Sequence, residues 1–145
     1  MNAPMIARPG TDAFHRERSR CIDAFAACEE AVATLFFQTG AKAGADVLAQ
    51  KISSLAKIPA SPGYAKARRE KVIVQLSALA DLLPVRADIV HGRLRLAQID
   101  GEIFACFVNA KDLGGDYLKA RLLPFENLRT LTRTVTKIAE DLRAA

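Results

Sequence analysis

The chain has 145 residues, half of them apolar, and a formal net charge of +5. This is enough apolar sequence for one core in a single domain without disulfide or metal crosslinks. No apolar run approaches the roughly 20 residues that span a bilayer, and the first ten residues lack the apolar stretch of a signal peptide. We therefore expect a cytoplasmic protein that does not associate with membranes.

The three cysteines are Cys21, Cys28 and Cys106, an odd number without the CxxC spacing of a metal or redox site. His15 and His91 lie too far from them in sequence to complete a zinc finger. We therefore expect buried free thiols, with no metal and no other cofactor.

Residues 1–10 contain two prolines and are expected to form a flexible leader. Thr11 or Asp12 can cap a long helix that ends near residues 39–40. A second helix is expected over about 45–57, because Pro59 disfavours helical geometry in the residue before it. The helical stripe of the first helix consists of Ile22, Phe25, Cys28, Val32, Leu35 and Phe36.

A third helix is predicted over about 64–83, from leucines and valines repeating every three or four residues. Pro84 suits the first turn of a new helix, where a missing N–H costs little. We therefore expect a short separate helix beginning at Pro84 and ending at Gly92.

Polar and apolar residues alternate after Gly92, and Asp100-Gly101 is a typical tight-turn pair. The pattern predicts a β-hairpin over about 93–109, followed by a loop at 111–116. Pro124 opens a last helix whose heptad stripe either closes a helical core or forms a dimer seam. The stripe consists of Leu128, Leu131, Val135, Ile138 and Leu142.

These elements predict a mainly α fold in one domain over residues 11–145. We expect an antiparallel helical bundle of about four long helices, with the short helix at Pro84 and one inserted β-hairpin.

The candidate chemistry lies in the stretch 86–95. Arg86 supplies a permanent planar cation for phosphate, and His91, five residues later, can exchange protons near neutral pH. Arg93 and Arg95 follow directly and would extend a track of phosphate contacts. An RNA or another polyanion is therefore a candidate partner.

The run Arg86-Ala87-Asp88-Ile89-Val90-His91-Gly92 resembles the hallmark of the HEPN family (higher eukaryotes and prokaryotes nucleotide-binding), in which four to six residues lie between an arginine and a following histidine. The resemblance implies a helical homodimer with two motifs at a shared cleft. It also implies metal-independent endoribonuclease activity, of the toxin or defence type, with an antitoxin as a further partner. Arg86 and His91 would be the catalytic residues, and Asp88 a supporting one.

Active members of the family usually carry a polar residue directly after the arginine, where this chain has Ala87. Three readings therefore stay open: a ribonuclease, a non-catalytic nucleotide- or RNA-binding protein, and a protein-interaction helical module. In the last reading Arg86 pairs with Asp81 or Asp88, and His91 bonds a carbonyl at a helix end. The aromatic residues Phe104, Phe107 and Tyr117 could stack on bases, but core positions are favoured for them.

Overall fold

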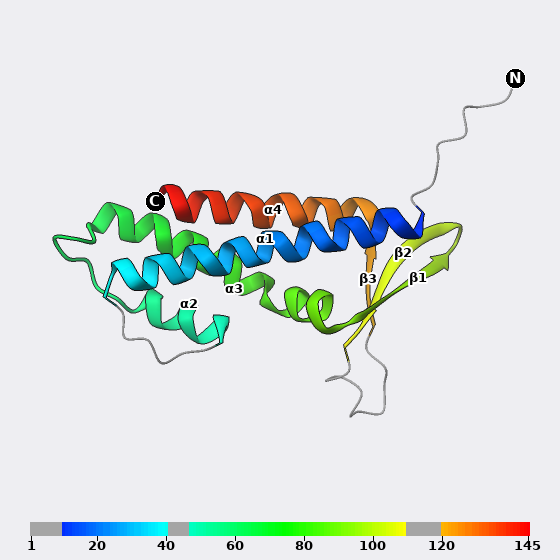
Figure 1. The fold of residues 1–145 in the computed structure, drawn as a ribbon, viewed down its shortest axis with the longest axis horizontal. Coiled ribbons are helices and arrows are strands. Elements are labelled where there is room, and N and C mark those ends of the chain that lie inside the picture. Colours follow the sequence, from blue (N-terminus) through cyan, green and yellow to red (C-terminus); the bar gives the residue numbers. More distant parts are fainter. Residues whose placement is uncertain (1–9, 41–46, 110–119) are drawn as a thin grey trace, which may run out of the picture.

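The computed structural model describes residues 10–40, 47–109 and 120–145. The helices are α1 (Thr11–Gln38), α2 (Leu48–Ala56), α3 (Lys66–His91) and α4 (Phe125–Ala144), and the strands are β1 (Arg93–Ile99), β2 (Glu102–Val108) and β3 (Ala120–Pro124). The prediction of a mainly helical protein is confirmed. Figure 1 shows α1, α3 and α4 extending along the long axis, with the sheet at one end.

The core lies mainly between α1 and α4, which pack side by side (Figure 1). On α1, Phe25, Cys28 and Val32 are almost fully buried, as their helical spacing predicts. The stripe of α4 is buried in the same core except for the partly buried Leu131. It therefore closes the core of its own chain and is not free to act as a dimer seam.

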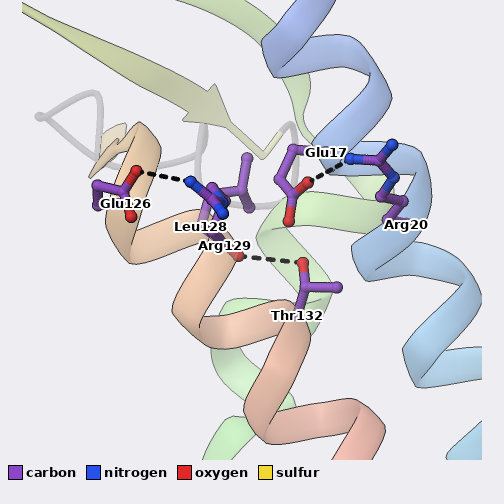
Figure 2. Close-up of polar contacts among 6 residues, drawn as sticks. All are labelled: Glu17, Arg20, Glu126, Leu128, Arg129 and Thr132. Carbon is purple, nitrogen blue, oxygen red and sulfur yellow. Dashed lines mark hydrogen bonds and ion pairs between the residues drawn. The ribbon is translucent and has the colours of Figure 1, made fainter. Parts of the chain in front are cut away.

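Few polar contacts support the α1–α4 interface. Figure 2 shows Glu17 paired with Arg20 at 3.2 Å on α1, and Glu126 with Arg129 at 3.0 Å on α4. The Thr132 hydroxyl donates to the carbonyl of Leu128 within α4. Each of these contacts stays within one helix. The exposed Glu126–Arg129 pair contributes about 0–1 kcal/mol, whereas the Glu17 side chain is buried and only its partner Arg20 is exposed. Between the helices, the buried Cys28 thiol donates to the carbonyl of Val135 at 3.3 Å. Apolar burial makes the main contribution that holds the two helices together.

The predicted break at Pro84 is wrong. Pro84 lies inside α3, which continues without interruption to His91. A proline within a helix removes one hydrogen bond and costs about 3 kcal/mol. Burial of Leu79 before it and Ile89 after it, both fully inaccessible, holds the two halves in one helix. There is thus no separate short helix around the candidate motif.

The predicted hairpin is confirmed as β1 and β2, which pair antiparallel. Asp100 and Gly101 both have positive φ angles, 50° and 79°, as a tight hairpin turn requires. The sheet also contains β3, paired antiparallel with β2, which the sequence analysis did not predict. Residues 1–9 of the expected leader at 1–10 lie outside the described residues, as do the loop at 111–116 and the first residues of the predicted second helix.

Candidate functional site

The candidate motif occupies the last turns of α3, directly before β1. His91 is the last helical residue and its side chain is exposed. Gly92 follows, and its N–H donates to the carbonyl of Asp88 at 2.8 Å. A Cβ at Gly92 would overlap that same carbonyl oxygen and approach the Cβ of Phe107 to 3.2 Å. The passage from helix to strand therefore requires glycine at this position.

Arg86 turns toward α1, where its guanidinium forms an ion pair with the Glu29 carboxylate. The Arg86 side chain is 24% exposed and that of Glu29 is 40% exposed. The Nε of Arg86 is buried, and it has no hydrogen-bond partner in the described part of the chain. The acid that pairs with Arg86 is thus neither Asp81 nor Asp88. It lies 57 residues earlier in the chain, so local spacing could not reveal it.

Asp88 joins α3 to the sheet. Its carboxylate accepts a hydrogen bond from Arg121 Nε of β3 at 2.7 Å. The buried Asn109 side chain donates to the same carboxylate at 3.4 Å. Asp88 is therefore a structural link in this arrangement, not a free acid or base beside Arg86.

The residue that sequence reasoning missed is Arg18 of α1. Its Nε and Nη2 donate to the carbonyl of Ile89 at 3.0 and 2.9 Å, and Nη2 also donates to the carbonyl of Gly92 at 2.8 Å. Carbonyls at a helix C-terminus lack helical partners and carry partial negative charge, which a cation stabilises. Arg18 thus caps α3 and positions the backbone that carries His91.

Arg86 and His91 are not brought onto one face of α3. Five residues of α-helix turn the direction of a side chain by about 140°. Arg86 faces α1, whereas His91 is exposed and forms no side-chain hydrogen bond with any described residue. One copy of the chain therefore does not place the two side chains around a single phosphate.

The exposed residues here are His91, Arg93 and Arg95, which we call the junction surface. They are alternate residues of the chain, from the end of α3 into β1. Within the described ranges, none of the three pairs with an acid. The junction surface therefore offers two guanidinium groups and an imidazole whose hydrogen-bonding capacity is not used by the described residues.

A groove of about 580 Å³ lies on the other side of the motif, between α3, β3 and α4. Neither Arg86 nor His91 lines it. Its lining includes Leu82, Pro84, Val85, Arg121, Leu123 and Leu131. The groove is mainly apolar, and its one basic side chain, Arg121, is already paired with Asp88.

Across the described ranges, no three histidine, cysteine, aspartate or glutamate side chains gather in a way that would hold a metal ion. None of the described helices combines the length and apolarity needed to cross a bilayer.

No family model, curated protein or solved structure matches the chain. The HEPN resemblance therefore rests on residues 86–92 and on the order of the elements.

Proposed function

We propose that this chain is an HEPN-like protein that binds RNA through the junction surface of His91, Arg93 and Arg95. The observation that supports this is the exposure of all three side chains without an acidic partner in the described structure. Phosphate is the ligand that two unpaired guanidinium groups favour, because it accepts their paired N–H donors. The net charge of +5 adds a long-range attraction for a polyanion.

The HEPN resemblance extends this proposal to the assembly. In that view α1, α3 and α4 correspond to the helical bundle of the family, and two copies associate so that their motifs share a cleft. The expected all-antiparallel order does not apply to α1 and α4, which run in the same direction, since Phe14 contacts Phe125 and Cys28 contacts Val135 (Figure 1). The protein acts in the cytoplasm, and an antitoxin neutralises it if it is a toxin. Sedimentation at micromolar concentration tests the assembly, since a monomer would contradict a shared cleft.

Metal-independent RNA cleavage is the second candidate function, and one observation favours it. The partner of Arg86 is the partly exposed Glu29, and ion pairs that contact solvent are weak enough for a phosphate to replace the acid. Arg86 would then neutralise the scissile phosphate. His91 of the second copy would supply the proton transfers, because one copy does not bring the two side chains together.

In that reaction the ribose 2′-oxygen bonds to phosphorus while the bond to the 5′-oxygen breaks. His91 accepts the proton of the 2′-hydroxyl and then transfers this proton to the leaving 5′-oxygen. The products are a 2′,3′-cyclic phosphate and a 5′-hydroxyl. Because the 2′-hydroxyl is the nucleophile, the substrate is RNA and not DNA.

A charge-matched comparison tests the proposed binding. The double variant Arg93→Gln/Arg95→Gln removes two charges from the junction surface. The control Arg16→Gln/Arg133→Gln removes two charges from exposed positions on α1 and α4. We expect fluorescence anisotropy with a labelled RNA to show weaker binding for the first variant only. Equal weakening in both would mean that net charge alone attracts RNA, which would contradict a defined site.

A further inference from the structure

The helices cover only one of the two faces of the described sheet. Side chains alternate between faces along a strand, and Leu94, Ala105 and Phe107 are buried on the face that meets the helices. Every described residue of the opposite face is partly or fully exposed. We call this the outer face. It carries Arg93, Arg95, Ala97, Ile99, Glu102, Phe104, Cys106, Val108, Ala120, Leu122 and Pro124.

The outer face is mainly apolar, which is unusual for a surface open to solvent. Ile99 and Leu122 are 44% and 41% exposed, respectively. Its charges are separated along β1 and β2: Arg93 and Arg95 lie toward α3, and Glu102 lies beside the hairpin turn. Arg93 and Arg95 thus form a cationic end of this apolar surface, and they follow His91 closely in the chain.

The strand register places an aromatic ring beside these cations. Phe104 lies opposite the small Ala97 on β1, and Arg95 lies opposite Cys106. Arg95 and Phe104 are therefore diagonal neighbours on one face, within the reach of a long side chain. Of the two hairpin aromatics, Phe107 is in the core, 1% exposed, whereas Phe104 remains partly accessible on the outer face.

We infer that the outer face binds single-stranded RNA, with a base stacked on Phe104 and phosphates held by Arg93 and Arg95. This rests on the proposed RNA binding and defines the RNA that is bound. An unpaired strand offers free base faces to an aromatic ring and phosphates to neighbouring cations. In a duplex the bases are stacked on each other and cannot lie on an apolar sheet.

A second copy of the chain is the other candidate for covering this face. It would have to bury two guanidinium groups, and the described outer face supplies only Glu102 as a counter-charge. Burial of an unpaired charge is costly. RNA supplies one phosphate per nucleotide, so the charge on the outer face favours RNA.

The chain has no tryptophan, which permits a direct test. Phe104→Trp places the single tryptophan of the chain on the outer face. Phe37→Trp is the control, because Phe37 is 89% exposed on α1 at the end away from the sheet (Figure 1). We expect single-stranded RNA to quench the fluorescence of the Phe104→Trp variant saturably and to leave the control unchanged. A duplex of the same sequence should quench neither.

Phe104→Leu supplies the binding test while keeping an apolar side chain. We expect its affinity for single-stranded RNA to fall at least about fivefold, the lower range for loss of one stacked base. Unchanged affinity, or quenching by duplex as strong as by single strand, would overturn the inference. The fluorescence of the Phe104→Trp variant also tests the alternative occupant. If its emission shifts to the blue as the protein concentration rises without RNA, and sedimentation shows a dimer, a second copy covers the outer face and the inference is overturned.

The failures of the two proposals are distinguishable. If Arg93→Gln/Arg95→Gln weakens RNA binding but Phe104→Leu does not, only the stacking site is wrong. If wild-type protein binds RNA no better than the arginine variant, the proposed function itself is wrong.

Discussion

Arg18 on α1 holds the carbonyl of Ile89, 71 residues later in the chain, through two hydrogen bonds of 3.0 and 2.9 Å. The same guanidinium lies 5.8 Å from the centre of the Phe107 ring on the inner face of the sheet. One side chain therefore joins α1, the end of α3 and the hairpin. The orientation of the junction surface depends on this contact.

Replacing Arg18 should loosen the end of α3. Arg18→Gln removes charged hydrogen bonds, and we expect the free energy of unfolding to fall by about 1.5–3 kcal/mol. Urea denaturation measures the loss, with Arg16→Gln, an exposed neighbour on α1, as the control. Equal stability of the two variants would mean that Arg18 does not cap α3.

Gly92 should not tolerate a side chain, for a steric reason. We expect Gly92→Ala to lower stability by about 1–3 kcal/mol, because its Cβ would overlap the carbonyl of Asp88. Gly63→Ala is the matched control, since a Cβ at Gly63 has no atom within 4 Å. Thermal melts of the two variants should differ clearly. A Gly92→Ala protein as stable as the control would show that the junction relaxes easily.

The helical core and the hairpin were predictable because their patterns are local. The repeat on α4 and the alternation after Gly92 each reflect a single buried face. The continuity of α3 through Pro84 was not predictable, since it depends on packing around both halves of the helix. Strand β3 was missed because it has only five residues and is part of the sheet through its pairing with β2, which the local sequence does not reveal.

In the candidate site, too, the features with a local sequence pattern were predictable and those that depend on distant segments were not. The exposure of Arg93 and Arg95 agrees with their alternation along a strand. The partners Glu29 and Arg121 come from distant segments, so the sequence pattern around Arg86 and Asp88 gave no sign of them.

Stability should fall in alkaline solution because of two core cysteines. Burial raises the pKa of Cys21 and of Cys28 from 9.0 to about 11. Unfolded thiols ionise near pH 9 and folded ones only near pH 11, so stability is intact below pH 9 and is lost as the pH rises toward 11. Each cysteine contributes a loss of roughly 2–3 kcal/mol.

Denaturant titrations across this pH range measure the effect. The double variant Cys21→Ala/Cys28→Ala should show a much flatter dependence on pH. If the wild-type and variant curves run parallel, the two thiols are not the groups responsible.

The ribonuclease hypothesis makes a prediction that separates it from binding alone. In the presence of EDTA, the wild type should then produce RNA fragments with 2′,3′-cyclic phosphate ends, and His91→Ala should produce none. Glu29→Gln frees Arg86 from its ion pair and should preserve or raise cleavage, whereas Arg86→Gln should abolish it. Circular dichroism verifies that each variant is folded. Cleavage that survives both His91→Ala and Arg86→Gln would exclude this site.

The salt dependence of RNA binding tests the junction surface most directly. Each phosphate neutralised on a single strand contributes about −0.7 to the slope of log K against log salt concentration. If Arg93 and Arg95 each hold a phosphate, Arg93→Gln/Arg95→Gln should reduce the magnitude of that slope by about 1.4. The control Arg16→Gln/Arg133→Gln should keep the wild-type slope. Identical slopes for all three proteins would contradict RNA binding at the junction surface.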